Sequence, residues 1–201
     1  MRGAHRSDRL NPFVDQFRKF IDVSGWLTEF EGGLLTVTST FVASRIPEPT
    51  IVEIGSYVGR STVCLAAPLV GSSGRLYAID PHEGKIDGRN EVGSTLAALR
   101  ATLESAGVAD VVDVIVAKST DVKWTKPIHF LFIDGWHNEA SVRADFEHFA
   151  PHVVMGGFVA FHDYEPNCPG VMAVVDQILA RGSFGSIAAA HTLRLLQRRG
   201  S

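Results

Sequence analysis

Acidic side chains accompany four apolar segments of this sequence. Glu53 lies inside the apolar residues 51–54, whereas Asp80, Asp134 and Asp163 each follow an apolar segment directly. A carboxylate is costly to bury unless a cation or a hydrogen-bond donor accompanies it. Open α/β sheets bind their ligands at the carboxyl ends of the strands. We therefore expect a ligand site at these strand ends, with a cationic or hydrogen-bonding ligand facing Glu53.

A glycine turn follows Glu53. Residues 51–61 read IVEIGSYVGRS, which predicts a buried strand, a turn containing Gly55 and Gly59, and the start of a helix. The glycines let the backbone approach a ligand and pack against the helix. A dinucleotide fingerprint has a second glycine where this chain has Tyr57, and Glu53 would repel a pyrophosphate. The turn therefore favours a cationic ligand without phosphate, and S-adenosylmethionine fits that description.

Two polar residues after the next strands are candidates for binding a nucleoside. Asp80 could accept both hydroxyls of a ribose, in S-adenosylmethionine or in a dinucleotide. Because Pro81 follows at once, Asp80 could instead be a helix cap or a turn residue. Ser119 follows the third expected strand, where a serine taken alone indicates a turn or a cap.

The glycine turn resembles the first motif of class I S-adenosylmethionine-dependent methyltransferases, which is E-x-G-x-x-x-G after an apolar strand. Residues 55–61 are similar to the glycine loop of the metal-dependent O-methyltransferases of the catechol type, and the later motifs look closer to bacterial relatives that methylate sugar hydroxyls. The resemblance extends over residues 24–198. It implies a cofactor site, with the serine after the third strand against the adenine, made of Glu53, Gly55, Ser56, Tyr57, Gly59, Ser61, Asp80, Ser119 and Asp134.

A second motif spans residues 130–137, which read FLFIDGWH. In the catechol-type family, the aspartate equivalent to Asp134 holds a divalent cation near the methionine end of the cofactor, and a lysine three residues later is the base. His137 stands in that place, as in the sugar-modifying relatives. An imidazole with an ordinary pKa near ~6.5 can accept a proton at neutral pH. The resemblance therefore implies that His137 is the catalytic base, although a lone histidine could also cap a helix.

A third motif spans residues 155–164, which read MGGFVAFHDY. The catechol-type pattern has two metal ligands, an aspartate and an asparagine, at Asp163 and Tyr164. A neutral phenol is a poor ligand for a hard cation, so the adjacent His162 is the expected substitute, provided that the strand has ended before it. Carboxylates at neighbouring strand ends repel unless a proton or a cation lies between them. The expected ligands of Mg²⁺ or Mn²⁺ are Asp134, Asp163 and His162.

The expected strands and helices that carry these motifs alternate along the chain. This alternation predicts an α/β fold with a parallel sheet and helices on both faces. The resemblance adds a Rossmann-like sheet of seven strands with an antiparallel last strand. The expected strands are 51–54, 75–79, 111–116, 128–133, 157–161, 186–190 and 192–196. The expected helices are 12–22, 27–45, 60–70, 90–105, 138–149 and 171–181.

Length and composition favour a single domain of 201 residues, with a helical lid at 1–45 and a cofactor-binding core at 46–198. The net charge of −3 argues against nucleic acid as a partner. There is no apolar run of membrane-helix length and no signal-peptide core in residues 1–11. Two cysteines do not make a disulfide framework. These features favour a cytoplasmic location, with a homodimer left open.

The sequence thus predicts a metal-assisted O-methyltransferase that uses S-adenosylmethionine, with a sugar hydroxyl as the first choice of acceptor and a phenol or catechol as the second. Two other classes stay open. One is a nicotinamide-dependent oxidoreductase, which Tyr57 and the missing G-x-G disfavour. The other is an inactive S-adenosylmethionine-binding protein, which the presence of Asp134, His137 and Asp163 disfavours.

Overall fold

The computed structural model describes residues 20, 22–86, 89–90 and 94–200, and the structural account is confined to them. Nine strands lie in this part of the chain. Their bounds are β1 Thr50–Ile54, β2 Arg75–Asp80, β3 Lys85–Ile86, β4 Arg89–Asn90, β5 Val112–Val116, β6 Ile128–Ile133, β7 Val153–Phe161, β8 Phe184–Ala190 and β9 Leu193–Arg198.

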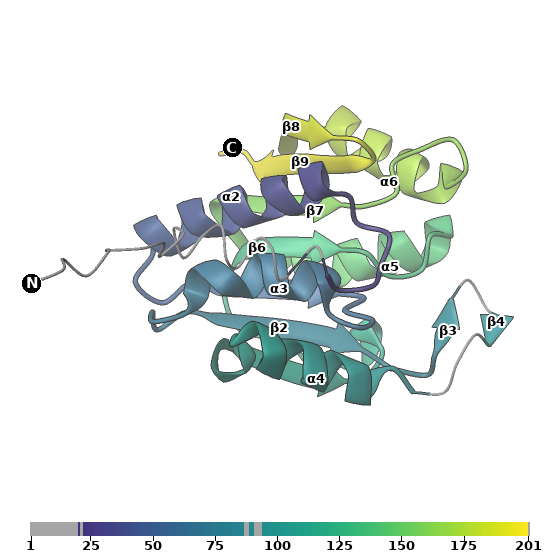
Figure 1. The fold of residues 1–201 in the computed structure, drawn as a ribbon. Helices are drawn as coiled ribbons and strands as arrows, with labels where there is room; N and C mark the ends of the chain where they lie inside the picture. Colours follow the sequence, from purple (N-terminus) through teal and green to yellow (C-terminus); the bar gives the residue numbers. More distant parts are fainter. Residues whose placement is uncertain (1–19, 21, 87–88, 91–93, 201) are drawn as a thin grey trace, which may run out of the picture.

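Seven of these strands form one sheet in the order β5-β2-β1-β6-β7-β9-β8, and β3 pairs with β4 separately (Figure 1). The strands from β5 to β7 in this order pair in parallel. The last strand of the chain, β9, pairs antiparallel with both β7 and β8. The predicted Rossmann-like sheet with an antiparallel last strand is confirmed.

Helices cover both faces of the sheet. In Figure 1, α2, α3 and α4 lie in front of it, and α5 and α6 lie behind it. Side chains of successive strand residues alternate between the two faces, so Ile51 belongs to the core beneath α2, α3 and α4, whereas Val52 belongs to the core beneath α5 and α6. The helix bounds are α2 Glu29–Arg45, α3 Arg60–Ala66, α4 Leu96–Ala106, α5 Glu139–Phe149 and α6 Pro169–Arg181.

The predicted elements agree with the structure at most positions. The strand predicted at 128–133 has the bounds of β6, and a short 3-10 helix at Ala67–Leu69 continues α3 to within one residue of the predicted end of that helix. Gly107 adopts the left-handed conformation that ends α4, as glycine commonly does after a helix. The sheet strands β7 and β8 begin before the predicted residues.

The helix predicted at 90–105 is wrong at its start. Asn90 belongs to β4, and α4 begins only after Thr95. Thr95 is buried, and its hydroxyl lies 2.8 Å from the Nδ1 atom of His82, a contact that ties this position to the preceding loop. The helix predicted at 12–22 falls outside the described residues except at Phe20 and Asp22.

Among the described residues, no helix combines the length and the apolar character needed to cross a membrane.

Candidate active site

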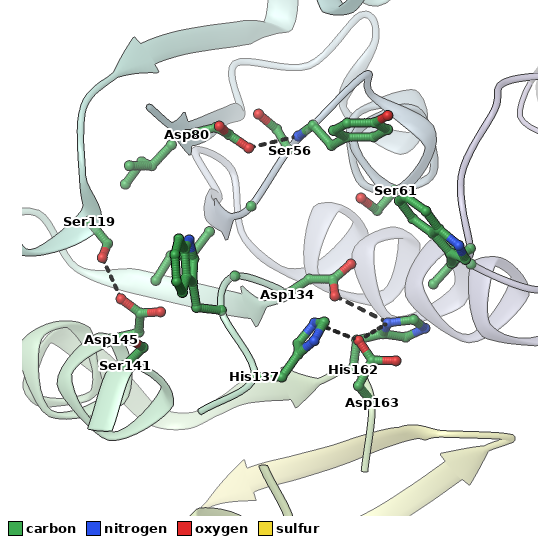
Figure 2. Close-up of a pocket in the computed structure, with 18 of the residues that line it drawn as sticks. Ser56, Ser61, Asp80, Ser119, Asp134, His137, Ser141, Asp145, His162 and Asp163 are labelled. Atoms are coloured by element: carbon green, nitrogen blue, oxygen red, sulfur yellow. Dashed lines mark hydrogen bonds and ion pairs between the residues drawn. The ribbon is translucent and has the colours of Figure 1, made fainter. Parts of the chain in front are cut away.

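A cavity of about 1040 Å³ opens at the carboxyl ends of β1, β2, β6 and β7. Along the chain, the strands are added on one side of β1 as β2 and β5 and then on its other side as β6 and β7, so the strand order reverses at β1. Doubly wound sheets bind ligands at such a reversal, and the cavity lies there. Two groups of polar side chains line it. Figure 2 shows them as an Asp80 end, with Asp80, Ser119 and Asp145, and a histidine end, with Asp134, His137, His162 and Asp163.

The turn after β1 depends on two glycines for packing within the chain. Gly55 has φ +89°, and a Cβ atom there would lie 2.1 Å from the carbonyl oxygen of Asp134. Gly59 has φ +98°, and its Cβ atom would lie 2.8 Å from a methyl group of Leu99 on α4. Gly55 borders the cavity, whereas Gly59 is not among the lining residues. Close contact between chain segments therefore accounts for both glycines.

Asp80 closes β2 and is held by backbone groups. Its Oδ2 accepts a hydrogen bond from the Tyr57 N–H at 2.9 Å, and its Oδ1 accepts one from the His82 N–H at 2.6 Å. A carboxylate oxygen can accept more than one hydrogen bond, so Asp80 keeps capacity for a ligand hydroxyl. The cap and ligand interpretations of this residue are thus compatible.

Glu53 corrects one of our inferences. Its carboxyl group is fully buried and accepts hydrogen bonds from the hydroxyls of Ser61 and Thr62 on α3, the latter at 2.7 Å. Burial raises the pKa of Glu53 to about 8, although these two hydrogen bonds oppose the shift. Burial thus favours the neutral form of the group, and it does not line the cavity. Because the hydroxyls of Ser61 and Thr62 satisfy the carboxyl group, its burial does not by itself require a cationic or hydrogen-bonding ligand, and a role in cofactor binding stays a prediction.

At the Asp80 end of the cavity, Ser119 contacts a carboxyl group that was not predicted from the sequence. The Ser119 hydroxyl donates to Oδ1 of Asp145 on α5, and both residues line the cavity. Burial raises the pKa of Asp145 to about 6 against the opposing effect of this hydrogen bond. The helix pattern could have indicated it, because Asp145 shares the buried face of α5 with Val142 and Phe149.

At the other end of the cavity, His162 lies between two aspartates. Its Nδ1 atom is 3.1 Å from Oδ1 of Asp134 and 3.1 Å from Oδ2 of Asp163. The strand β7 ends at Phe161, and Asp163 has the left-handed φ of +58°, which aspartate tolerates better than most residues. Because the strand has ended, the adjacent side chains reach the same site. Ligand atoms of the three residues lie within 4.8 Å of one another, so the expected metal ligands lie close together.

Charges of opposite sign determine the protonation of this cluster. Burial lowers the pKa of His162, but the carboxylates of Asp134, Asp163 and Glu31 outweigh that effect, and the pKa lies well above its usual range. Burial raises the pKa of Asp163, but hydrogen bonds from His137 and His162 bring it well below its usual range. The pKa of Asp134 stays above its usual value because burial dominates there. The two aspartates therefore favour the charged form of His162.

His137 joins the same cluster from the loop between β6 and α5. Its Nε2 atom lies 2.9 Å from Oδ2 of Asp163, the oxygen that also contacts His162. Asn138, the next residue, is the residue that caps α5 by accepting from the Ser141 N–H. His137 therefore does not take the capping position and lines the cavity instead.

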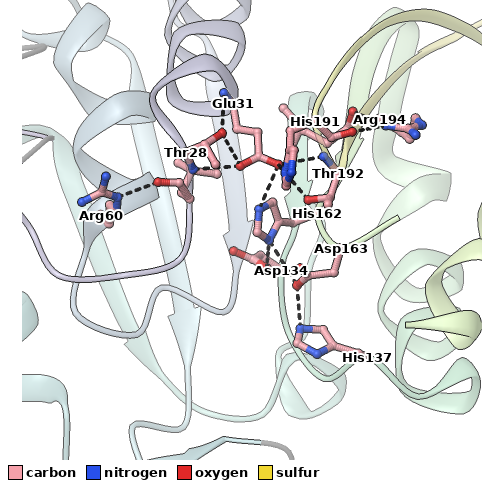
Figure 3. A network of polar contacts seen from close by, with 12 residues as sticks. Thr28, Glu31, Arg60, Asp134, His137, His162, Asp163, His191, Thr192 and Arg194 are labelled. Carbon is pink, nitrogen blue, oxygen red and sulfur yellow. Dashed lines mark hydrogen bonds and ion pairs between the residues drawn. The ribbon is translucent and has the colours of Figure 1, made fainter. Parts of the chain in front are cut away.

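Glu31 reaches the histidine end from the first turn of α2 (Figure 3). It is fully buried, and its Oε1 lies 3.4 Å from Nε2 of His162. Acids in the first turn of a helix are commonly solvated, but Glu31 is enclosed by other parts of the chain. The sequence signal was the capping box Thr28-x-x-Glu31, which the structure contains, but that motif does not indicate the contact with His162.

The segment before α2 forms one wall of the cavity. Arg60, the first residue of α3, donates hydrogen bonds to the carbonyl oxygens of Leu27, at 2.8 Å, and Val23. Trp26 is 66% exposed, lines the cavity, and has its ring centroid 5.6 Å from that of Tyr57. This wall is where a lid was expected, and a lid function stays a prediction.

Comparison with known proteins places this site in a family. Residues 52–164 match the family model described as the methyltransferase domain. The matched residues extend from β1 through the cluster that contains Asp163. The chain belongs to this family. The matched region contains Asp80, Ser119 and Asp145 at one end of the cavity.

Solved structures share the fold of this methyltransferase domain. The O-methyltransferase NovP is 17% identical, with 88% of this chain and 84% of that chain covered and a TM-score of 0.74. TomG, an O-methyltransferase from Streptomyces achromogenes involved in tomaymycin synthesis and solved with SAM, is 19% identical, with 98% and 93% covered and a TM-score of 0.67. An O-methyltransferase from Bacillus cereus solved with SAH is 17% identical, with 92% and 91% covered and a TM-score of 0.69.

Most of the predicted site residues of the methyltransferase domain border one cavity, and the exceptions are Glu53 and Gly59. Tyr164, which replaces the asparagine of the catechol-type pattern, faces elsewhere. Its hydroxyl donates to Asp176 on α6 at 2.8 Å, and the guanidinium group of Arg194 lies 4.4 Å from its ring centroid. Tyr164 is thus committed to other contacts, and His162 occupies the position beside the aspartates.

Proposed function

We propose that this methyltransferase domain is an S-adenosylmethionine-dependent O-methyltransferase. The observation that carries the proposal is the hydrogen-bonded pair of His137 and Asp163, with 2.9 Å between Nε2 and Oδ2, in the same cavity as Asp80 and the glycine turn. One cavity thus offers a nucleoside-binding end and a proton acceptor. The family match and the O-methyltransferase fold of NovP and TomG support this assignment.

The cofactor would lie along the carboxyl edge of the sheet. Asp80 would accept the ribose hydroxyls, and Ser119 with Asp145 would face the adenine, since all three line one end of the cavity. The methionine part would then extend past Gly55 toward Asp134. A carboxylate beside the sulfonium is electrostatically favourable, whereas the several acids of this cavity would repel a pyrophosphate.

The reaction would be a displacement at the methyl carbon. The acceptor oxygen forms a bond to that carbon, the carbon–sulfur bond breaks with its electron pair going to sulfur, and the proton of the hydroxyl goes to His137. The chain would align the acceptor with that bond and exclude water. Asp163 would stabilise the imidazolium form of His137, because its Oδ2 lies 2.9 Å from Nε2.

The histidine end also fits a divalent ion. Asp134, Asp163 and His162 would hold Mg²⁺ or Mn²⁺, because two carboxylates and an imidazole offer ligand atoms within 4.8 Å of one another. When bound, the ion would lower the pKa of the acceptor hydroxyl. His162 has to lose the proton that it holds between the aspartates to become a ligand, so metal affinity should fall as the pH is lowered.

The proposed acceptor is an uncharged hydroxyl compound, with a sugar first and a phenol or catechol second. The lining near the histidine end includes Asp163 and Glu165, and Glu83 lies farther along. Acidic walls repel anionic acceptors such as phosphorylated sugars or coenzyme A thioesters. The exposed rings of Trp26 and Trp136 offer apolar surface beside these polar groups.

Two measurements test the proposed function. Calorimetry should detect binding of S-adenosylmethionine and its demethylated product but no tight binding of NAD; the reverse result would refute the cofactor assignment. A panel of glycosides, free sugars, phenols and their phosphorylated counterparts should then be screened for release of S-adenosylhomocysteine. Release with uncharged members and not with phosphorylated ones is expected, and release with phosphorylated acceptors alone would contradict the acceptor class.

A further inference from the structure

The imidazole of His162 contacts acidic groups through both of its nitrogen atoms. Nδ1 lies 3.1 Å from Oδ1 of Asp134 and 3.1 Å from Oδ2 of Asp163. Nε2 lies on the other side of the ring, 3.4 Å from Oε1 of Glu31. The side chain of His162 is only 5% exposed, so its ring orientation depends on these neighbours.

Glu31 accepts hydrogen bonds from Thr28, three residues before it, and from Thr192, 161 residues after it. Its Oε1 accepts from the backbone N–H of Thr192 at 3.0 Å and from the Thr192 hydroxyl at 2.7 Å. Its Oε2 accepts from the backbone N–H of Thr28 at 2.8 Å and from the Thr28 hydroxyl at 2.7 Å. Four donors thus fix one carboxylate that is fully buried, and hydrogen bonds of this kind favour its charged form.

The capping box by itself does not require this arrangement. A capping box uses the acid to accept from the N-cap residue, and Oε2 fulfils that role through Thr28. Oε1 is left to face Thr192, the ring of His162 and, at 3.5 Å, Nδ1 of the more exposed His191 (Figure 3). Nε2 of His162 is buried and makes no hydrogen bond of ordinary length with any described group, so Glu31 at 3.4 Å is the acceptor that a modest shift would engage.

A histidine that binds a metal generally donates its other ring N–H to a carboxylate or carbonyl group, which sets the tautomer and orients the ring. We propose that Glu31 is the positioning residue for His162, keeping the proton on Nε2 so that Nδ1 would be free to bind a divalent ion together with Asp134 and Asp163. The inference rests on the divalent ion of the proposed function. It also explains how α2, outside the matched residues 52–164, takes part in the site.

The test uses Mn²⁺ alone as the probe, so that no acceptor is needed. The affinity of the purified full chain for Mn²⁺ would be measured from the electron paramagnetic resonance signal of the free ion, with affinity for S-adenosylhomocysteine measured by calorimetry. Glu31→Gln should weaken Mn²⁺ binding by roughly 10–100-fold and leave S-adenosylhomocysteine affinity nearly unchanged. Thr192→Val, which removes one donor to Oε1 and keeps the charge of Glu31, should weaken Mn²⁺ binding in the same direction by less.

A control variant separates positioning from a general loss of negative charge in α2. Glu29→Gln makes the same change on an exposed residue in the same turn of the helix, and it should bind Mn²⁺ like the wild type. If Glu31→Gln and Thr192→Val also bind like the wild type, the positioning role is refuted and the metal site stands. If the wild type binds no Mn²⁺, the metal part of the proposed function fails, and this inference fails with it.

Discussion

The two ends of the cavity are assembled in different ways. At the Asp80 end, Asp80 is held by backbone N–H groups of Tyr57 and His82. At the histidine end, side chains of opposite charge hold one another, and Glu31 is bonded to Thr192, 161 residues away. The Asp80 end therefore depends on the local shape of a turn, whereas the histidine end depends on charge balance and on the closure of the whole sheet. Perturbations of charge should affect the two ends unequally.

If the chain binds the proposed divalent ion, removal of that ion should have the largest effect and should separate the two ends completely. Excess chelator is expected to reduce turnover to background, because Asp134 and Asp163 would lose the cation between them, and Mg²⁺ or Mn²⁺ should restore it. Affinity for S-adenosylhomocysteine should change little. Turnover and calorimetry in parallel would measure both. Full turnover in chelator would mean that the two aspartates act on cofactor and acceptor directly.

The next largest effect is expected for His137→Ala. Loss of a general base should lower turnover by roughly 10²–10⁴-fold while cofactor affinity stays nearly constant. The control is His152→Ala, which removes a histidine just before the start of β7. The cavity lies at the other end of that strand. Release of S-adenosylhomocysteine gives the turnover. If both variants behave alike, the role of His137 is structural.

Asp80→Ala should lower the affinity for the cofactor, which His137→Ala should leave nearly constant. Each charge-assisted hydrogen bond that a ribose hydroxyl would make to Asp80 would contribute about 1.5–3 kcal/mol, so the dissociation constant for S-adenosylmethionine should rise by at least about tenfold for each bond lost. Mn²⁺ binding at the histidine end should stay at the wild-type level. Calorimetry and the Mn²⁺ titration would check the two halves of this prediction. Equal losses at both ends would contradict their independence.

The smallest expected effect concerns Asp145 and the pH dependence of stability. Burial raises the pKa of Asp145 from 3.8 to about 6, so between these pH values the folded chain binds more protons at this group than the unfolded chain does. This contribution to the free energy of unfolding therefore decreases as the pH rises from about 4 to about 6 and is constant above that.

Asp145→Asn removes this dependence. The free energy of unfolding of the wild type should fall relative to that of the variant by at most about 3 kcal/mol across the window, since one pKa unit corresponds to about 1.4 kcal/mol. Urea unfolding of both proteins between pH 4 and pH 8 would measure the difference. Parallel curves would show that Asp145 is not an acid with a raised pKa.

Much of the fold could be predicted from the sequence because it is encoded locally. The apolar residues 128–133 and the glycines at 55 and 59 specify a strand and a strand–turn–helix unit without reference to distant contacts. Element boundaries were less predictable where tertiary contacts decide them. The start of α4 is an example. The hydroxyl of Thr95 forms a hydrogen bond with the ring of His82, and the helix begins only at the next residue, Leu96.

The candidate site divides in the same way. Asp134, His137 and Asp163 could be predicted because each follows a strand whose apolar pattern is visible in the sequence. The reason given for Glu53 failed because the sequence does not show that the hydroxyls of Ser61 and Thr62 turn back toward it. Asp145 was missed because an acid on a helix is usually solvated, although its spacing from Val142 and Phe149 places it on the apolar face of α5.

The sequence by itself determined the order of strands and helices, the glycine turn and the acids at the strand ends, because these follow from residue periodicity and backbone sterics over a few residues. Only the tertiary structure decided that Glu31 faces His162 and that Thr192 holds it there. These contacts of Glu31 with His162 and Thr192 require α2 to pack beside α3, and β9 to insert between β7 and β8. Such contacts depend on the closure of the whole chain, which no local pattern contains.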